Sequence, residues 1–217
     1  MKKAVLFDMD GVLVDSQPIH FTGDRRLLEH CGVRVKEKDL EKYAGTSNPN
    51  RFKMFIDAYG FNHTVEEMDR VREDIMKQLV DESGLKAISG IEALLKDLKL
   101  NHFQIALASS SSYVFIDSIL DKIGIRDYFD YILSGEDLAN SKPAPDIFLE
   151  AAKGLGCLPH QCIVIEDSNN GVAAAKAAGM KCIGYMNRTS GNQDLTKATV
   201  VIDDFNRINA QFIEKLI

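Results

Sequence analysis

The sequence lacks the features of several protein classes. Its four cysteines form no C-x-x-C pair and have no accompanying histidine pattern, so a zinc site is not expected. A secreted scaffold stabilised by disulfides is not expected at 217 residues, and reduced thiols used as small core residues are the favoured interpretation. No G-x-G-x-x-G or P-loop sequence occurs, which argues against a nucleotide-binding module.

Long apolar runs and an excess of positive charge are also missing. No stretch approaches the roughly 20 apolar residues of a membrane-spanning helix. Lys2 and Lys3 precede a short apolar run, as in a signal peptide, but Asp8 and Asp10 interrupt that run. The net charge of −6 argues against nucleic-acid and anionic-membrane partners. We therefore expect a cytoplasmic protein; no residue pattern marks a subunit interface, and a monomer is expected.

Short apolar runs that alternate with helical patterns indicate the fold class. Apolar residues make up 45% of the chain and charged residues 27%, the balance of an ordinary soluble globular protein. Strands that are apolar throughout and alternate with helices predict a parallel sheet covered on both faces, and so an α/β fold. Strands are expected at 4–7, 104–108, 131–133, 162–165 and 181–185, with an edge strand at 199–202, and helices at 113–123, 144–155 and 170–178.

The alternation is broken between residues 16 and 83, where no convincing strand occurs. Helical patterns lie instead around 19–30, 38–43, 50–59 and 65–81. We therefore expect a helical insertion after the first strand, with residues 1–15 and 85–217 in one domain and residues 16–84 in a second.

Polar side chains follow the ends of the predicted strands. In an open parallel sheet, ligands bind beyond the carboxyl ends of the strands. Four strand ends would bring two acidic pairs, a hydroxyl and an amine to one region. Gly11 would relieve crowding where the backbone turns away from a ligand. The residues are Asp8 and Asp10 after the first strand, Ser109 after the second, Lys142 in the loop after the third, and Glu166 and Asp167 after the fourth.

These residue types fit phosphoryl transfer. A carboxylate nucleophile at Asp8 would split a difficult displacement into two steps through an aspartyl-phosphate. Carboxylates that face a phosphate need charge compensation, which Mg²⁺ held by Asp8 and Asp167 would supply. Lys142 and the Ser109 hydroxyl would bind phosphate oxygens. Asp10 would protonate the leaving oxygen and then activate water.

Each of these residues also has a purely structural interpretation. The acidic residues at 8–10 could form a strand-end turn, since Asp-Gly is a common turn pair, and Ser109 could cap the following helix. The acidic pair at 166–167 could lie in the first turn of a helix, and Lys142 could be an ordinary surface lysine. Taken together, the four strand ends favour the functional interpretation.

Four motifs resemble those of the haloacid dehalogenase-like superfamily in its phosphotransferase form. The stretch 8–16 (DMDGVLVDS) resembles the family's signature, 108–110 (ASS) its second motif, 141–143 (SKP) its third and 165–168 (IEDS) its fourth. Their order and spacing match over essentially the whole chain. The resemblance implies a Rossmann-like parallel sheet core with an inserted small, all-helical cap domain that closes over the active site.

The resemblance also implies ligand and substrate residues. Mg²⁺ would be held by Asp8, the Asp10 backbone carbonyl and Asp167, with Glu166 close by. His20 would lie near the entrance and help to couple Asp10 to closure, although a helix histidine without a role is the alternative. Substrate contacts are expected at His20, Gly45, Thr46, Asn48, Arg51 and Ser110.

The chain is similar to the beta-phosphoglucomutase-like subgroup, with two departures. The stretches 141–148 (SKPAPDIF) and 15–20 (DSQPIH) match the subgroup. At 45–48 the chain has GTSN where the mutase has Gly-Val-Ser-Arg, and Arg51 would compensate only if it points the same way. At 111–113 it has SSY where the mutase has Ser-Lys-Asn. Two cationic contacts to a second phosphate are therefore missing, each worth roughly 1.5–3 kcal/mol.

We therefore predict a Mg²⁺-dependent phosphatase that acts on a small phosphorylated metabolite, such as a sugar phosphate, through an aspartyl-phosphate. A beta-phosphoglucomutase-type mutase is the alternative among enzymes. A catalytically silent binding protein on the same fold is the alternative of another class. Asp10 argues against a dehalogenase, because carbon–halogen displacement needs neither the metal nor a proton donor at that position.

Overall fold

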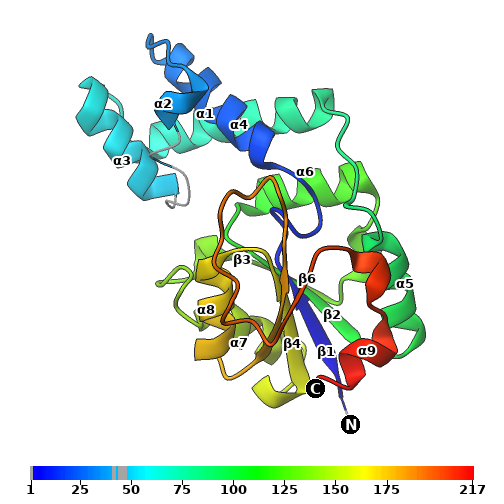
Figure 1. Ribbon diagram of the computed structural model, residues 1–217. Helices are drawn as coiled ribbons and strands as arrows, with labels where there is room; N and C mark the ends of the chain where they lie inside the picture. The colour runs from blue at the N-terminus through cyan, green and yellow to red at the C-terminus, as the bar shows by residue number, and fades with distance from the viewer. Residues whose placement is uncertain (1, 41–42, 44–47) are drawn as a thin grey trace. The chain divides into compact units, whose positions relative to one another are not determined.

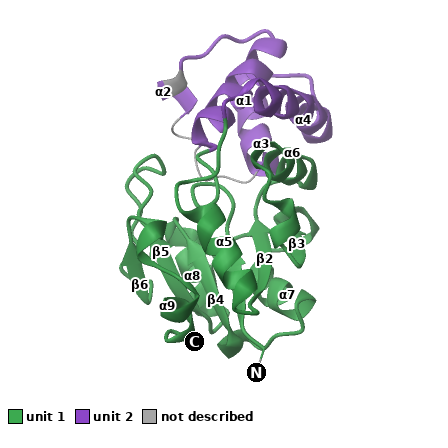
Figure 2. Ribbon diagram, turned by 90° about the vertical axis from the view of Figure 1, so that its right-hand side faces the viewer, with its two compact units in different colours: residues 1–15, 85–217 green, residues 16–84 purple. Residues whose placement is uncertain are grey.

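The computed structural model describes residues 2–40, 43 and 48–217. The chain divides into two compact units, shown in different colours in Figure 2. The core unit consists of Met1–Asp15 and Leu85–Ile217, and the helical unit consists of Ser16–Gly84.

A six-stranded parallel sheet forms the centre of the core unit (Figure 1). The strands lie in the order β3-β2-β1-β4-β5-β6, so β1 is paired on both sides. Phe7 at the end of β1 is in register with Leu107 of β2 and Ile165 of β4, which brings the carboxyl ends of these strands to one edge. The strands are β1 (Ala4–Phe7), β2 (Gln104–Ser109), β3 (Tyr131–Ser134), β4 (Cys162–Glu166), β5 (Lys181–Tyr185) and β6 (Val200–Ile202).

Helices cover both faces of the sheet. α7 (Asp146–Gly154) packs against β1, β2 and β3, and α8 (Asn169–Ala177) packs against β4 and β5. α5 (Ile91–Leu100) packs against β2 and against α9 (Ala210–Glu214), and α6 (Tyr113–Ile123) packs against β3. Figure 1 shows α7 and α8 on one side of the sheet and α5 and α9 on the other. Short 3₁₀ helices lie at Arg126–Tyr128, Gly135–Asp137, Pro159–Gln161 and Phe205–Arg207.

The helical unit has its own apolar core. α1 and α4 pack closely at Gly23 of α1. A Cβ at this position would lie only 2.4 Å from Met76 Sδ of α4, so the absence of a side chain allows the contact. The helices of the unit are α1 (Gln17–His30), α2 (Glu37–Leu40), α3 (Asn48–Tyr59) and α4 (Val65–Glu82). Its buried residues include Leu27, Leu28, Leu40, Tyr43, Phe52, Phe55 and Met68.

The predicted fold class is confirmed: the chain has an α/β fold with a parallel sheet covered by helices on both faces. The sequence interpretation missed α5 and α9. It also placed the start of α7 at 144, whereas that helix begins at Asp146. Pro145 has no N–H and disfavours the helical conformation at Ala144, so the helix starts after it.

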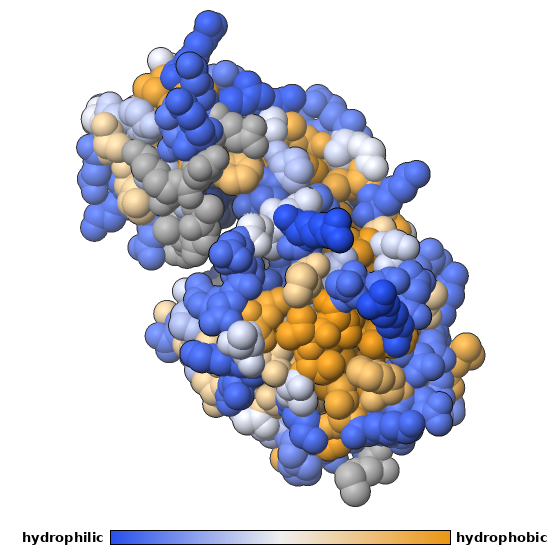
Figure 3. All heavy atoms as spheres, viewed as in Figure 1, coloured by the Kyte–Doolittle hydropathy of each residue, from blue (hydrophilic) through white to orange (hydrophobic). Residues whose placement is uncertain are grey.

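Some large apolar side chains of the core unit are exposed. Met186 and Val201, at the β5–β6 edge of the sheet, are 57% and 41% exposed. Figure 3 shows apolar side chains gathered on one face of the core unit. Among the residues described, none of the helices combines the length and the apolar character needed to cross a bilayer.

Candidate active site

The carboxyl ends of β1, β2 and β4 place three sets of polar residues at one edge of the sheet. Asp8 follows β1 directly, Ser109 is the last residue of β2, and Glu166 is the last residue of β4. The Asp8 N–H donates to the Ile165 carbonyl at 3.0 Å, so the ladder between β1 and β4 continues to the nucleophile candidate. The sheet register therefore brings together residues that are up to about 160 positions apart in sequence.

Lys142 joins Asp8 to Glu166. Its Nζ donates to Asp8 Oδ1 at 2.6 Å and to Glu166 Oε1 at 2.8 Å, and it lies 3.3 Å from the Ala108 carbonyl oxygen. The Lys142 side chain is 7% exposed and the Glu166 side chain is 1% exposed. Glu166 Oε2 accepts from the backbone N–H and hydroxyl of Ser168, at 2.7 and 2.9 Å. Both carboxylate oxygens of Glu166 are thus engaged, and one of them orients Lys142 towards Asp8.

The pKa of Lys142 is raised above its ordinary value. Burial lowers it, but the Asp8 and Glu166 carboxylates raise it by more through their charge and their hydrogen bonds. The amine therefore carries a positive charge throughout the physiological pH range.

Asp10 is held by two serines at the end of β2. Ser111 Oγ donates to Asp10 Oδ2 at 2.8 Å, and Ser109 Oγ lies 3.5 Å from the same oxygen. Ser109 Oγ in turn accepts from the Ser111 N–H at 3.1 Å. Ser112, not Ser109, caps α6, because its hydroxyl accepts from the Phe115 N–H. The structural interpretation of Ser109 as the helix cap is therefore wrong.

Asp167 lies against the loop that follows β1. Gly11 has a φ of +80°, and a Cβ there would lie 2.0 Å from Asp167 Oδ2. The Ser190 hydroxyl donates to the same Asp167 oxygen. Only glycine fits at position 11, because both the backbone conformation and the nearby carboxylate exclude a side chain. Asp167 precedes α8, whose N-cap is Ser168, so it is not a first-turn helix charge.

Burial and mutual repulsion raise the pKa values of the acidic residues. The pKa of Asp8 is well above its ordinary value because the carboxyl is buried, with Glu166, Asp167 and Asp10 adding to the rise and Lys142 opposing it. The pKa of Asp167 is raised to about 7, again chiefly by burial and then by Glu166. Lys142 pairs directly with two of these four carboxyl groups, Asp8 and Glu166.

This donor set fits a hard divalent cation. Carboxylate and carbonyl oxygens are the ligands that Mg²⁺ prefers, and a cation beside Asp8 and Asp167 would favour their ionised forms. Over the part of the chain that the structure describes, no group of three or more His, Cys, Asp or Glu side chains could hold a metal ion. Asp8 and Asp167 could supply two carboxylates to such a cation, with its remaining ligands drawn from other oxygen groups.

The predicted substrate residues of the helical unit lie around one buried charge cluster. Arg72 Nε donates to Asp24 Oδ1 at 2.8 Å, and Arg51 Nε lies 3.2 Å from Asp24 Oδ2. Arg51 also donates to the side-chain oxygen of Asn48, and Arg72 Nη2 lies 3.2 Å from His20 Nδ1. The pKa of Arg51 is lowered to about 10, chiefly by burial. Arg51 is 8% exposed, so its guanidinium is engaged inside the unit.

The other predicted substrate residues are Ser110 in the core unit and Gly45 and Thr46 in the helical unit. Ser110 is exposed and follows Ser109 at the end of β2. Gly45 and Thr46 lie outside the described residues.

Four residues of the site were missed by the sequence interpretation. Ser111 lies in a run of serines in which position alone does not say which hydroxyl reaches Asp10. Asn187, Thr189 and Ser190 follow β5, a strand end to which no chemistry was assigned. The order of the strands would have signalled them, because β5 lies next to β4 and its end must reach the same edge.

Comparisons with known proteins identify the family of the chain. The family described as haloacid dehalogenase-like hydrolase matches residues 5–185. A putative phosphatase, YhcW, of Bacillus subtilis is 33% identical over 95% of this chain and 90% of its own length. A phosphorylated carbohydrates phosphatase of Thermotoga maritima is 31% identical over 92% of each chain.

A solved structure is similar over the whole chain. The crystal structure of beta-phosphoglucomutase from Clostridium difficile is 33% identical to this chain and superposes with a TM-score of 0.81, covering 99% of this chain and 96% of that one. The family match, the relatives and the fold all agree with the motifs found in the sequence, and the chain belongs to the haloacid dehalogenase-like hydrolase family.

Proposed function

We propose that the chain is a Mg²⁺-dependent phosphatase that hydrolyses a small phosphorylated metabolite through an aspartyl-phosphate on Asp8. The observation that carries this proposal is the position of Asp8, a buried carboxylate at the end of the central strand with the Lys142 ammonium 2.6 Å away. Sugar phosphates are the proposed substrate class, supported by the similarity to the Thermotoga maritima phosphatase. The free thiols of the four cysteines support a reducing compartment such as the cytoplasm.

Mg²⁺, bound by Asp8, Asp167 and the Asp10 backbone carbonyl, would compensate the charge of nucleophile and phosphate. Asp8 would attack phosphorus, while Lys142 neutralises phosphate oxygens and is itself oriented by Glu166. The Ser109 hydroxyl, which is fully buried, would donate to a phosphate oxygen.

Asp10 is the proposed general acid and base. It would donate a proton to the leaving oxygen, then take one from the water that attacks the aspartyl-phosphate. The Ser111 hydroxyl donates to Asp10 Oδ2 at 2.8 Å and so orients the Asp10 carboxyl group. Because Asp8 regains its carboxylate in the second step, the enzyme returns to its starting state.

Two positions at which the mutase has a cationic side chain carry neutral residues in this chain, and this favours a phosphatase over a mutase. Asn48 stands where the mutase has an arginine, and its side-chain oxygen accepts from Arg51. Ser112 stands where the mutase has a lysine, and its hydroxyl caps α6. Asn48 and Ser112 are both neutral, so neither side chain supplies a positive charge to a second phosphate. The mutase remains the second candidate because of the similarity to the Clostridium difficile enzyme.

Phosphate release from a panel of sugar phosphates and other small phosphates tests the proposal. The panel is run with Mg²⁺ and with EDTA, on the wild type and on Asp8→Asn, with beta-glucose 1-phosphate plus a trace of its 1,6-bisphosphate alongside. We expect release that requires both Mg²⁺ and Asp8. Conversion to glucose 6-phosphate without release would make the chain a mutase, and no turnover of any compound would favour a silent binding protein.

A further inference from the structure

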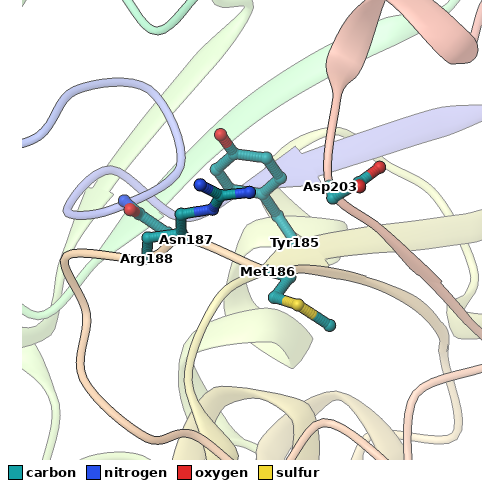
Figure 4. Close-up of a pocket in the computed structure, with 5 residues that line it drawn as sticks. All are labelled: Tyr185, Met186, Asn187, Arg188 and Asp203. Atoms are coloured by element: carbon teal, nitrogen blue, oxygen red, sulfur yellow. The ribbon is translucent and has the colours of Figure 1, made fainter.

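The segment after β5, Asn187–Ser190, contacts the catalytic edge of the core unit at three places. Asn187 Nδ2 donates to the Gly11 carbonyl oxygen at 2.9 Å, and the Thr189 hydroxyl lies 2.8 Å from Asp15 Oδ1. The Ser190 hydroxyl donates to Asp167 Oδ2. In Figure 4 the Asn187 side chain points towards the N-terminal loop drawn in blue, whereas Met186 points away from it. Four consecutive positions thus carry three contacts to the chain around the proposed metal ligands.

Ser190 holds the carboxylate of Asp167 in one orientation. Gly11 lies on the same side, where a Cβ would be 2.0 Å from Asp167 Oδ2 and 2.7 Å from Ser190 Oγ. The three residues therefore pack directly against one another. Since Asp167 is 5% exposed, little water is available to replace the serine hydroxyl as a hydrogen-bond donor.

Asn187 holds the turn that carries Asp10. The Gly11 N–H donates to the Val14 carbonyl at 2.8 Å and the Gly11 carbonyl accepts from Asn187, so the peptide groups on both sides of Gly11 are fixed. The Thr189 N–H donates to Asn187 Oδ1 at 2.9 Å, which orients the Asn187 amide with its Nδ2 towards Gly11. The carbonyl of Asp10 belongs to the first of these peptide groups.

Gln193 connects the segment Asn187–Ser190 to the start of α8 by two hydrogen bonds. Gln193 Nε2 donates to the Ser190 carbonyl at 2.9 Å, and Gln193 Oε1 accepts from the Asn169 N–H at the start of α8 at 3.0 Å. The segment also lines a cavity of about 320 Å³ formed by Tyr185, Met186, Asn187, Arg188 and Asp203 (Figure 4). Of the segment, Asn187 and Arg188 line this cavity, whereas Ser190 contacts Asp167.

We propose that Asn187–Ser190 is a positioning segment: Ser190 fixes the Asp167 carboxylate and Asn187 fixes the Gly11 turn, and together they set the geometry of the groups that bind Mg²⁺. The inference rests on the proposed function, because it names residues that support its metal site. Groups hydrogen-bonded to metal ligands orient those ligands, and their loss costs about 10- to 100-fold in metal affinity.

Mn²⁺ binding to the full chain without substrate tests the inference. Free Mn²⁺ is counted by electron paramagnetic resonance for the wild type, Ser190→Ala, Ser190→Thr and Asn187→Ala. Thr196→Ala is the matched control, since Thr196 lies in the same connection between β5 and β6 and its hydroxyl donates to the Asp194 carboxylate at 2.6 Å. Thermal unfolding in EDTA reports whether each variant is folded, and the Mg²⁺ dependence of phosphate release is measured in parallel.

We expect Ser190→Ala to weaken Mn²⁺ binding about 10- to 100-fold. Ser190→Thr should restore most of the affinity because it keeps the hydroxyl, Asn187→Ala should lower it, and Thr196→Ala should leave it unchanged. Phosphate release by Ser190→Ala should recover when Mg²⁺ is raised. Asn187→Ala gives an independent result should Ser190→Ala fail to fold.

The inference would be overturned if folded Ser190→Ala bound Mn²⁺ as tightly as the wild type does. If only Asn187→Ala folds, wild-type affinity in that variant would overturn it. Either result would leave the proposed function standing. Failure of the wild type to bind Mn²⁺, or equal binding by Asp167→Asn, would contradict the proposed metal site itself. The two failures are therefore distinguishable.

Discussion

Gly11 has a conformation and a neighbour that no other residue type tolerates together. Its φ is +80°, in the left-handed region, and its Cα faces the Asp167 carboxylate. A side chain at position 11 must either strain the backbone and displace Asp167 or force the loop away from α8. Either change moves a proposed metal ligand.

Gly11→Ala should therefore lose both stability and activity. The left-handed conformation costs about 1–2 kcal/mol, and the added crowding about 1–3 kcal/mol more. Displacement of Asp167 by an ångström should lower phosphate release about 100-fold. Urea denaturation and phosphate release are the measurements.

Gly124→Ala is the matched control for this substitution. Gly124 has a φ of +70°, and a Cβ there meets nothing within 4 Å. The control should lose only about 1–2 kcal/mol and keep its activity. Equal loss of activity in the two variants would show that backbone strain, not the contact with Asp167, explains the effect.

The sequence could predict the charged residues of the site but not the hydroxyls that hold them. Asp8 and Asp167 each follow an apolar strand directly, and in a parallel sheet such ends meet at one edge. Ser111 and Ser190 lie in loops whose path depends on tertiary packing. Their contacts with Asp10 and Asp167 are visible only once the loops are placed.

At the scale of elements, α1, α3 and α4 are joined through one buried carboxylate. Asp24 of α1 is 5% exposed and pairs with Arg51 of α3 and Arg72 of α4. Two guanidinium groups depend on it, and removing one partner of a buried ion pair leaves an uncompensated charge. The arrangement fixes the helices of this unit to one another.

Asp24→Asn should therefore destabilise the helical unit by about 3–5 kcal/mol. Hydrogen exchange followed by mass spectrometry, resolved between residues 16–84 and the core unit, measures where the loss occurs. Protection should fall in α1, α3 and α4 and be kept in the sheet.

Glu82→Gln provides the comparison with an exposed pair of the same unit. Arg26 Nη2 lies 3.2 Å from Glu82 Oε2, and the Glu82 side chain is 62% exposed. This variant should lose no more than about 1 kcal/mol. If both variants behave alike, the buried cluster does not stabilise the unit.

The strands were predictable to within a residue or two, because each is a short apolar run, and β1 and β4 are buried throughout. α5 was missed although Ile91, Leu94, Leu95 and Leu98 follow the helical period and are buried. The sequence interpretation did not use this period. The order of the strands depends on crossover connections and was not predicted.

At the scale of the whole molecule, the acidic cluster links stability to pH. The pKa of Asp167 is raised to about 7 in the metal-free fold, whereas in an unfolded chain it is near 4. Between these values the native protein retains a proton that the unfolded chain has lost. The free energy of unfolding contributed by this group therefore falls as the pH rises through that window.

Metal-free wild-type protein should show this fall between about pH 4 and pH 7 in urea denaturation with EDTA present. Asp167→Asn removes the group, so its profile should fall less over the same window. Saturating Mg²⁺ should raise the stability of the wild type at pH 7, because the cation binds only the folded site. Parallel pH profiles of the two proteins in EDTA would show that Asp167 does not carry the effect.

The most direct test of the account is the detection of a phosphoryl group on Asp8. The enzyme is mixed with a turned-over substrate and Mg²⁺, quenched in acid and reduced with borohydride, which converts an aspartyl-phosphate to homoserine; peptide mass spectrometry then locates the change. We predict homoserine at position 8, dependent on substrate and absent in Asp8→Asn. Modification at another residue, or full phosphate release by Asp8→Asn, would contradict the account.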